Sequence, residues 1–538
     1  RRSPFIFPAF GSKTMITEDQ SDVVDFLGAP STYGGEAVER IETHSAFVFL
    51  AGSRAYKLKR AVRFDYLDFS TAERRRAMCE AELRVNRRTA SNLYRCVVPV
   101  TREPTGVLAI DGRGTPIDWV IEMNRFPQEA LLDRLAAAQR LDLDLMPRLA
   151  AAIASFHVTA ERRPDHGGLT GMAAIVEGHA DGFAEYGPGV LDQASCRAWT
   201  DDARAELHRR GALLDERRAA GFVRQGHGDL HLGNIVVIDG RPTLFDAIEF
   251  NDGLACVDVL YDLAFLLMDL WHHRLPRHAN AVWNGYLAET GDLGGVALLP
   301  LFLSCRAAVR AKTNATAARL RPESRPRHDL QDLARAYLAM ARDLLHPPRP
   351  CVIAIGGFSG TGKSTLARGL APSIGPVPGA IVIRSDEIRK RLSGVSPLQR
   401  LVPEHYTPET SARVYAAAVD RAKVAIQQGH SVVIDAVFAR PDDRVAIERV
   451  ANEASVPFTG LWLEAPEAML VSRIERRRHD ASDATADVIR HQLEQPTGVV
   501  TWHRLDASTP PPVVLERAGA HVGAIGGANI GGIDAAAS

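Results

Sequence analysis

The chain has 538 residues, too many for one ordinary hydrophobic core, which indicates two or three domains. Hydrophobic residues make up 46% of it and charged residues 24%, as in ordinary soluble globular proteins. Because 64 Lys and Arg balance 65 Asp and Glu, the formal net charge is -1. The composition therefore argues against a protein that binds nucleic acid or a membrane surface through its total charge.

The six cysteines stand far apart and form no CxxC pair, which favours buried thiols in a reducing compartment over disulfides or a zinc knuckle. No apolar run reaches the roughly 18 residues of a membrane-spanning helix. The opening segment RRSPFIFPAFGSKTM has no apolar region long enough for export. We therefore expect a cytoplasmic protein without a membrane partner. We also expect translation to begin at Met15, within an N-terminal extension of residues 1–30.

The first half of the chain changes from strand patterns to helix patterns. Residues 38–60 alternate in polarity and turn at AGSR, which predicts an antiparallel hairpin, and residues 70–94 have the pattern of a long charged helix. Strand patterns return over residues 106–126, a helix is predicted at residues 127–136, and Ala/Leu/Arg-rich helices fill most of the chain to about residue 220. The order predicts an α+β domain over residues 31–345, in which a small sheet lobe joins a large helical lobe.

The second half begins after the proline-rich segment HPPRP, residues 346–350, which cannot continue a helix and is expected to be a linker. Residues 351–515 then read as strand, glycine loop, helix and strand, the pattern of a parallel α/β domain. Residues 516–538 are rich in Gly and Ala with little to bury, so we expect a disordered tail.

A phosphate-binding loop opens the second domain. The segment CVIAIGGFSGTGKSTLARGL is an apolar strand, a glycine turn of the form GxxxxGKS, and a helix. Glycines let backbone N–H groups turn inward around a polyphosphate, and the helix N-terminus favours negative charge. Lys363 can reach the outer phosphates of ATP, and the Ser364 hydroxyl can bind Mg²⁺. The predicted nucleotide-binding residues are Gly357, Ser359, Gly360, Thr361, Gly362, Lys363, Ser364 and Thr365.

Two later strands end in carboxylates that could serve this loop. Asp386 follows the strand AIVIR and could take a proton from an acceptor hydroxyl, while Arg389, one turn on, could orient an anionic substrate. The alternative for this pair is a helix N-cap with a surface arginine. Asp435 ends the buried strand SVVID and could hold Mg²⁺.

An arginine cluster, VSRIERRRHD, follows and could close over ATP. We assign Arg477 to the phosphoryl group, although a solvated helix face is the alternative for each arginine. Residues 351–514 resemble the small P-loop kinases, a group with polynucleotide 5′-kinases, zeta toxins, chloramphenicol phosphotransferase and gluconate kinase. The resemblance implies that Asp386 activates the acceptor and that Arg389 binds it, but the acceptor differs across the group.

The stretch HGDLHLGNI in the first domain has three interpretations. His227 and His231 could be two zinc ligands on a helix, but Gly228 and Gly233 disfavour a helix here. A capped structural turn is the second. The third is a kinase catalytic loop, in which Asp229 accepts the hydroxyl proton and Asn234 binds Mg²⁺.

The kinase interpretation requires three further groups, and the chain contains a candidate for each. Asp246 follows a strand–turn–strand segment and would be the second Mg²⁺ ligand, although DAI replaces DFG. Lys57, with Lys59 on the same strand face, would contact the phosphates, and Glu82, with Glu80 as the alternative, would pair with the lysine. For either residue alone, a surface ion pair is the simpler explanation.

These residues make the segment 38–345 resemble the aminoglycoside phosphotransferases, a group with a protein-kinase-like fold. In this resemblance VIEMNRF, Val120–Phe126, is the hinge at which adenine stacks, and Asp262 has a structural role. The departure is that no GxGxxG lies between the first two strands, where THSAF stands instead. Nothing in the sequence indicates an acidic pocket for a polycationic antibiotic. The whole chain has the order of bacterial bifunctional aminoglycoside phosphotransferase-like/ATP-binding proteins.

We therefore expect a bifunctional, ATP- and Mg²⁺-dependent enzyme that moves a γ-phosphoryl group to hydroxyls of small molecules. One alternative is that a single domain is catalytic and the other is an ATP-binding regulator. The other alternative is a C-terminal polynucleotide 5′-kinase, which the balanced charge disfavours.

Overall fold

The computed structural model describes residues 15–43, 45–64, 67–319, 321, 324–396, 399–476, 482–494 and 496–523. The chain forms two compact units. Unit 1 contains the chain up to His273 and the segment Leu301–His346, whereas unit 2 contains Arg274–Pro300 and the chain from Pro347 onward. The segment predicted as one domain, 31–345, thus supplies 27 residues (274 to 300) to the second unit.

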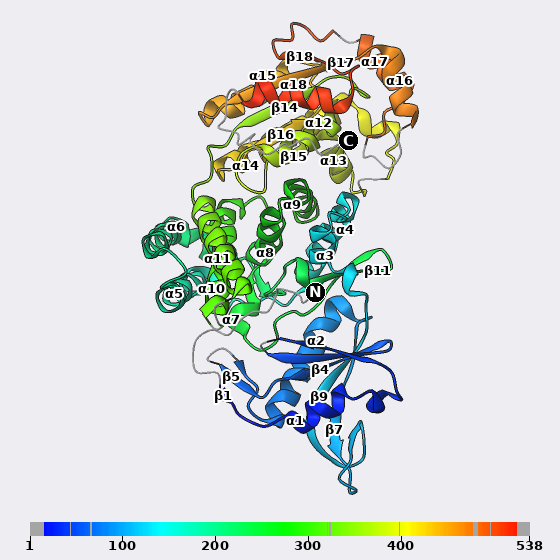
Figure 1. The fold of residues 1–538 in the computed structure, drawn as a ribbon. Helices are drawn as coiled ribbons and strands as arrows, with labels where there is room; N and C mark the ends of the chain where they lie inside the picture. Colours follow the sequence, from blue (N-terminus) through cyan, green and yellow to red (C-terminus); the bar gives the residue numbers. More distant parts are fainter. Residues whose placement is uncertain are drawn as a thin grey trace. The chain divides into compact units, whose positions relative to one another are not determined.

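The sheet lobe of unit 1 is a six-stranded antiparallel sheet covered by one long helix (Figure 1). In spatial order its strands are β2 (Val38–Glu42), β3 (Ala46–Ala51), β4 (Arg54–Lys59), β9 (Thr115–Asn124), β7 (Tyr94–Arg102) and β8 (Leu108–Ile110). The predicted hairpin corresponds to β3 and β4, and β2 adds a third strand before it. Helix α2 (Ala72–Ala90) packs on β7 and β9. It begins after Thr71, whose side chain accepts the N–H of Arg74 as an N-cap.

Smaller elements flank this sheet. They are β1 (Met15–Ile16), α1 (Ser21–Gly28), β5 (Val62–Phe64) and β6 (Leu67–Asp68). A cluster of apolar side chains fills the space between α1 and the sheet, and it includes Leu27, Phe49 and Val120.

The larger part of unit 1 is helical. Its helices are α3 (Leu132–Ala137), α4 (Met146–Thr159), α5 (Gly168–Tyr186), α6 (Gln193–Ala219), α7 (Asp252–Ala255), α8 (Val259–His272), α10 (Leu299–Arg319) and α11 (Arg325–Leu344). Two short antiparallel pairs lie among them, β10 (Val223–Gln225) with β13 (Cys256–Asp258) and β11 (Ile235–Ile238) with β12 (Arg241–Leu244). Every residue of α8 from Val259 to Leu270 is buried, which makes α8 the centre of this part.

Unit 2 is built on a five-stranded parallel sheet, as the glycine-loop pattern predicted. Its strands, in spatial order, are β15 (Ile381–Arg384), β16 (Val432–Asp435), β14 (Val352–Gly356), β17 (Phe458–Glu464) and β18 (His503–Asp506). Every residue of the central strand β14 is buried, which is typical of a parallel sheet covered on both faces.

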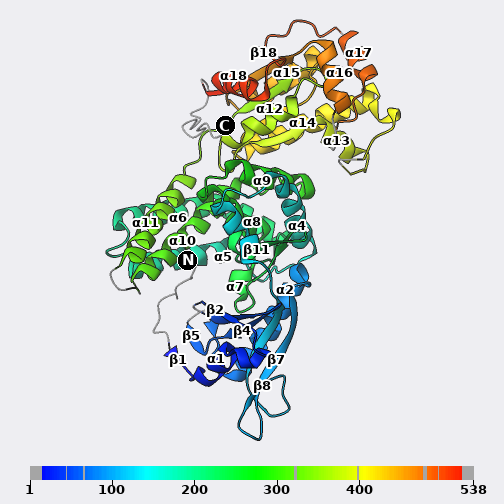
Figure 2. The same ribbon diagram turned by 45° about the vertical axis from the view of Figure 1, so that its right-hand side comes forward.

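Helices surround this sheet (Figure 2). They are α12 (Lys363–Leu370), α13 (Ser385–Leu392), α14 (Pro408–Gln427), α15 (Pro441–Glu453), α16 (Glu467–Arg476), α17 (Ala486–Glu494) and α18 (Pro511–Gly523). Helix α12 packs with α18, and α14 packs with α15. Unit 2 also contains α9 (Pro276–Thr290) from the 274–300 segment, which packs on strand β15.

The C-terminal tail differs from the prediction. In place of disorder from residue 516, helix α18 continues to Gly523, because Val514, Ala518 and Val522 are buried in the core of unit 2. The rest of the predicted tail, residues 524–538, lies outside the described residues.

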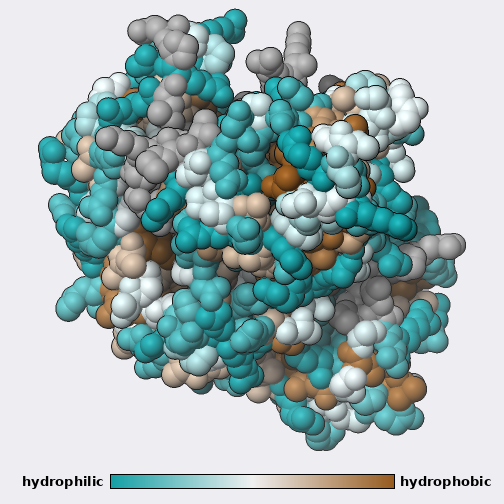
Figure 3. Space-filling view, turned by 90° about the horizontal axis from the view of Figure 1, so that it is seen from below, coloured by the Kyte–Doolittle hydropathy of each residue, from teal (hydrophilic) through white to brown (hydrophobic). Residues whose placement is uncertain are grey.

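The surface seen in Figure 3 is mainly hydrophilic, with apolar side chains in small scattered groups. Such scattered exposure is normal for a globular protein. Among the described helices, none is both long and apolar enough to cross a membrane.

Candidate active sites of the two units

Unit 1 brings together three charged side chains that are distant in sequence. Lys57, on β4, places its Nζ 2.7 Å from Oε1 of Glu82 on α2 and 2.6 Å from Oδ1 of Asp246. Burial opposes the charge on the lysine, but Asp246 and Glu82 outweigh it and raise the pKa of Lys57 well above its usual value. The predicted Lys–Glu–Asp set is therefore one connected cluster.

The segment that carries Asp246 is held in an unusual backbone conformation. Asp246 has a φ of 63°, in the left-handed region that few non-glycine residues occupy. The flanking residues fasten it, because the Phe245 N–H donates to the carbonyl of Asn234 and the Ala247 N–H donates to Oδ1 of Asn86 at 2.8 Å. Such local strain is common where a side chain must be aimed at a ligand.

The predicted catalytic loop is a tight turn and not an α-helix. It contains the short 3₁₀ helix η4 (Leu232–Asn234). The carboxylate of Asp262 on α8 accepts the N–H groups of His227 at 2.7 Å and Gly228 at 2.8 Å, and His157 contacts the same carboxylate. Asp262 is completely buried, so it is a structural anchor of the loop, as the sequence predicted.

Asp229 and Asn234 meet within this loop. The amide nitrogen of Asn234 donates to the backbone oxygen of Asp229 at 2.9 Å and to its Oδ2 at 3.0 Å, which leaves the amide oxygen of Asn234 for a cation. Burial opposes the charge on Asp229, but His231, followed by Arg310, outweighs it and lowers its pKa to about 2. Asp229 is therefore a carboxylate at any physiological pH.

The two histidines of the loop have structural contacts. The ring Nε2 of His227 lies 2.9 Å from the carbonyl of Phe245, and Nδ1 of His231 accepts the N–H of Gly233 at 3.1 Å. His231 also lies 3.3 Å from Oδ2 of Asp229. These contacts shape the HGDLHLGNI loop through Nε2 of His227 and Nδ1 of His231.

The predicted hinge, Val120–Phe126, contains the last residues of β9 and the two residues after this strand. Phe126 and Phe245 stand edge to face with ring centroids 5.3 Å apart, packed against a core that includes Met123 and Val236. These apolar side chains come from both lobes of unit 1.

In unit 2 the glycine loop runs from β14 to the start of α12. Gly357, Gly360 and Gly362 have φ values of 132°, 87° and 95°, which other residues rarely adopt. Lys363 donates to the carbonyl of Phe358 at 3.0 Å, so its ammonium group bends back over the loop. The hydroxyl of Thr361 donates to the same carbonyl at 2.8 Å, and Thr365 is exposed on α12.

A serine–aspartate pair lies beside this loop. The Ser364 hydroxyl donates to Oδ2 of Asp435 at 2.6 Å, across 71 residues of sequence. Arg384, at the end of β15, lies 3.3 Å from the same carboxylate oxygen and donates to the Ser364 hydroxyl at 3.1 Å. A hydroxyl beside a carboxylate next to a phosphate loop is a donor set that suits Mg²⁺.

The residues predicted to face an acceptor, Asp386 and Arg389, both lie on α13. Burial raises the pKa of Asp386, and the neighbouring Asp435 raises it further. Arg389 is mostly buried: it donates to the carbonyl of His405 at 2.9 Å, and its guanidinium lies 4.8 Å from the ring centre of Tyr406. Arg389 thus fixes the 3₁₀ helix η7 (Pro403–Tyr406) beside Asp386.

Several residues of the sites were not selected from the sequence. Arg384 is one, although its place directly before Ser385 and Asp386 was a signal. Gln492 on α17 is another, because its Oε1 accepts the N–H of Ser359 in the phosphate loop at 2.9 Å. No local motif marks Gln492. Arg477, the predicted phosphoryl ligand, lies outside the described residues.

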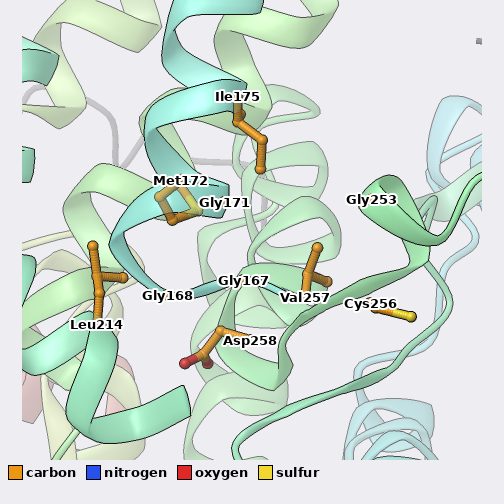
Figure 4. A pocket seen from close by; sticks show the side chains of 10 residues that line it. All are labelled: Gly167, Gly168, Gly171, Met172, Ile175, Leu214, Gly253, Cys256, Val257 and Asp258. Atoms are coloured by element: carbon orange, nitrogen blue, oxygen red, sulfur yellow. The ribbon is translucent and has the colours of Figure 1, made fainter. Parts of the chain in front are cut away.

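A separate pocket in unit 1 encloses about 340 Å³, part of it open solvent (Figure 4). It is lined by Gly167, Gly168, Gly171, Met172, Ile175, Leu214, Gly253, Cys256, Val257 and Asp258. None of these is a residue of the predicted catalytic site.

Three features define the class of protein. They are the sheet lobe with its Lys–Glu pair, the helical lobe with its Asp–Asn loop, and the parallel sheet with its phosphate loop. Unit 1 has a protein-kinase-like fold and unit 2 a P-loop kinase fold, and these two folds support a phosphotransferase. It belongs to the same family as the uncharacterized protein Rv2004c of Mycobacterium tuberculosis, with 30% identity over 477 residues, 87% of this chain and 92% of that protein.

Other comparisons concern parts of the chain. Residues 352–498 match the family model described as an AAA domain. The adenylyl-sulfate kinase of Myxococcus xanthus is 28% identical over 123 residues, 23% of this chain and 62% of that protein. Among solved structures, a choline/ethanolamine kinase family protein from Mesorhizobium loti is 15% identical, with a TM-score of 0.39 and coverage of 61% of this chain and 94% of that chain. A sugar kinase from a Janibacter species is 20% identical, with a TM-score of 0.26 and coverage of 33% and 95%.

Proposed function

We propose that both units are ATP- and Mg²⁺-dependent kinases that transfer a γ-phosphoryl group to a hydroxyl of a small molecule. The observation that carries the proposal is the cluster of unit 1. There Lys57 meets Glu82, 25 residues away, and Asp246, 189 residues away. Surface ion pairs do not require such a three-way arrangement from separate elements around a buried carboxylate, that of Glu82.

In unit 1 each group has a distinct task. Lys57 binds the phosphates of ATP and Glu82 keeps its ammonium group in place, while Asn234 and Asp246 would hold Mg²⁺. The acceptor hydroxyl hydrogen-bonds to the carboxylate of Asp229, which receives its proton as the acceptor oxygen bonds to the γ-phosphorus, the bond from this phosphorus to the bridging oxygen breaks, and ADP leaves. Bound Mg²⁺ supplies positive charge that neutralises the phosphate oxygens.

In unit 2 the phosphate loop and Lys363 hold the polyphosphate, and Ser364 with Asp435 would hold Mg²⁺. Asp386 receives the proton of the second acceptor, and Arg389, whose guanidinium lies 4.8 Å from the ring centre of Tyr406, faces and orients this acceptor. The raised pKa of Asp386 suits a general base better than that of an ordinary aspartate. The similarity to a relative named adenylyl-sulfate kinase supports a small-molecule acceptor for this unit.

The proposal includes a cytoplasmic location, supported by six cysteines that are all free thiols in the structure. The partners are small hydroxyl compounds. The balanced total charge, -1, disfavours nucleic acid as an acceptor.

The test is Mg²⁺-dependent ATP turnover by the wild type, Asp229→Ala and Lys363→Ala, each with a pool of sugars, aminoglycosides and nucleosides. Loss of a general base typically lowers turnover by roughly 10²- to 10⁴-fold. If each variant loses a different part of the activity, both units are kinases. If Lys363→Ala alone abolishes all turnover, unit 1 is a binding or regulatory module and the bifunctional proposal is wrong.

A further inference from the structure

A second lysine and a second carboxylate lie behind the Lys57–Glu82 pair. Lys59, two residues along β4, places its Nζ 2.7 Å from Oε2 of Glu82 and 2.5 Å from Oε1 of Glu249. Since Lys57 contacts Oε1 of the same glutamate, Glu82 bridges the two lysines, one through each carboxylate oxygen. The cluster therefore has a front pair, Lys57 with Asp246, and a rear pair, Lys59 with Glu249.

The two pairs differ in their access to a ligand. In the front pair 15% of the Lys57 side chain and 43% of the Asp246 side chain are exposed. In the rear pair these fractions are 2% for Lys59 and 5% for Glu249. The front pair can separate when phosphate and a cation arrive, because both partners face accessible space. The rear pair is buried, so we expect its ion pair to remain formed when the nucleotide binds.

The rear pair also fastens the segment that carries Asp246. Glu249 lies three residues after Asp246, so its bond to Lys59 ties residues 246–249 to strand β4. Asn86 on α2 ties the same segment from the other side through both the N–H and the carbonyl of Ala247. These two attachments hold Asp246 at its strained φ of 63°.

The charges of the cluster explain why Lys59 is needed. Glu82 and Glu249 are both buried, and burial raises the pKa of Glu249. Without the ammonium group between them, the two carboxylates would repel each other across a site with little water. When Lys57 leaves Asp246 and contacts the phosphates of ATP, Lys59 continues to hold the second carboxylate oxygen of Glu82 in place.

We infer that Lys59 and Glu249 are positioning residues of unit 1. They hold Glu82 and Asp246 in place, so that Lys57 can contact the phosphates of ATP and Asp246 can bind Mg²⁺. The inference rests on the proposed kinase function of unit 1. The rear pair itself does not contact the nucleotide. The rear pair acts on the Mg²⁺ site through the segment 246–249.

The experiment measures binding of a fluorescent ATP analogue as a function of Mg²⁺ concentration, in full-length protein with Lys363→Ala to silence the phosphate loop of unit 2. Glu249→Gln keeps the shape of the side chain and removes its charge. We expect the Mg²⁺ concentration for half-maximal binding to rise on the order of 10-fold, the usual effect of removing a partner behind a metal ligand. Binding without Mg²⁺ should change little, whereas general damage to the fold would weaken both.

Two controls accompany this variant. Glu80→Gln makes the same chemical change on α2, at a side chain that is 49% exposed and pairs with Arg76, and it should leave the Mg²⁺ dependence unchanged. The double variant Lys59→Met/Glu249→Gln removes both charges together, so it keeps the balance of the cluster and is expected to fold. It should show the same rise in the Mg²⁺ requirement.

The outcomes separate the inference from the proposed function. If Glu249→Gln, or the folded double variant, retains the Mg²⁺ dependence of its parent while Lys57→Ala loses the nucleotide, the inference is overturned and unit 1 is still a nucleotide-binding kinase. If the Lys363→Ala parent binds no nucleotide, or if Lys57→Ala binds it normally, the proposed function of unit 1 fails. A rise in the Mg²⁺ requirement in both rear-pair variants supports the inference.

Discussion

The side-chain oxygen of Asn284, on α9, accepts a hydrogen bond of 2.7 Å from the backbone N–H of Val382, on the edge strand β15 of unit 2. The amide nitrogens of Asn284 and Asn280 donate to the carbonyl of Ala380, directly before the same strand. An uncovered strand edge exposes unpaired N–H and carbonyl groups, which invite pairing with another chain. Helix α9 covers this edge, at the strand that leads to Asp386.

The substitution Asn284→Ala should lower the free energy of unfolding of unit 2 by about 1–3 kcal/mol, because it leaves the Val382 N–H without its partner. Urea unfolding measures this change. Glu289→Ala, on the exposed side of α9, should have almost no effect and is the control. An unchanged free energy in Asn284→Ala would mean that α9 does not stabilise the strand edge through this bond.

The stability of unit 1 should depend on pH through Glu82. Burial opposes its charge, but Lys57 and Lys59 outweigh burial and lower the pKa of Glu82 to about 2, below its ordinary value of 4.5. A carboxylate with a lowered folded-state pKa stabilises the fold above its unfolded pKa. This contribution is lost as the pH falls from 4.5 towards about 2.

We therefore expect the difference in unfolding free energy between the wild type and Glu82→Gln to be largest at neutral pH and to shrink below pH 4.5. Urea titrations at a series of pH values measure it, and Glu80→Gln, which is half exposed, should show no such dependence. A difference that stays constant throughout the acid range would contradict the ion-pair origin of the effect.

The glycines of unit 2 provide a matched pair of substitutions. Gly357→Ala would place a Cβ 2.5 Å from the carbonyl oxygen of Leu463 at a φ of 132°, so it should cost about 2 kcal/mol or more and weaken nucleotide binding. Gly519→Ala, in the middle of α18 with open space around it, should instead stabilise unit 2 by roughly 0.5–1 kcal/mol. Thermal unfolding with and without ATP distinguishes the two, and equal effects would contradict the strain argument.

Removal of the Ser364 hydroxyl should affect only unit 2. The hydroxyl is bonded to Asp435, and we propose it as a Mg²⁺ ligand, so Ser364→Ala should raise the Mg²⁺ requirement of unit 2 by at least about 10-fold. The measurement is Mg²⁺-dependent ATP turnover in an Asp229→Ala background. Ser373→Ala, which removes a hydroxyl bonded only to the carbonyl of Leu370 among the contacts described, is the control. Equal Mg²⁺ dependence in both variants would rule Ser364 out as a ligand.

Motifs that lie on one short stretch of the chain can be recognised from the sequence alone. The phosphate loop and the HGDLHLGNI loop are local, since their glycines and polar residues define the backbone and the donor set within a few positions. The α+β fold of the first domain and the parallel α/β fold of the second were also predicted correctly, from strand and helix periodicity. The predicted helix at residues 127–136 was only partly right, because it is a 3₁₀ turn, η2 (Gln128–Ala130), followed by α3.

Contacts between distant segments could not be predicted in this way. No sequence pattern near Glu249 predicts its contact with Lys59, 190 residues earlier. No pattern near Gln492 predicts its contact with Ser359, 133 residues earlier. The assignment of α9 to unit 2 is of the same kind, since its sequence reads only as an ordinary helix.

The sequence by itself determined the two folds through strand and helix periodicity, and it determined the phosphate loop and the candidate residues Asp229 and Asn234 because their signals are local in the chain. Lys57 was a candidate only through its order along the chain relative to that loop. The tertiary structure alone decided that Glu82 is shared by two lysines, that Arg384 joins Ser364 to Asp435, and that α9 covers strand β15. These relationships depend on which surfaces pack together, and packing is set by the whole core rather than by any one segment.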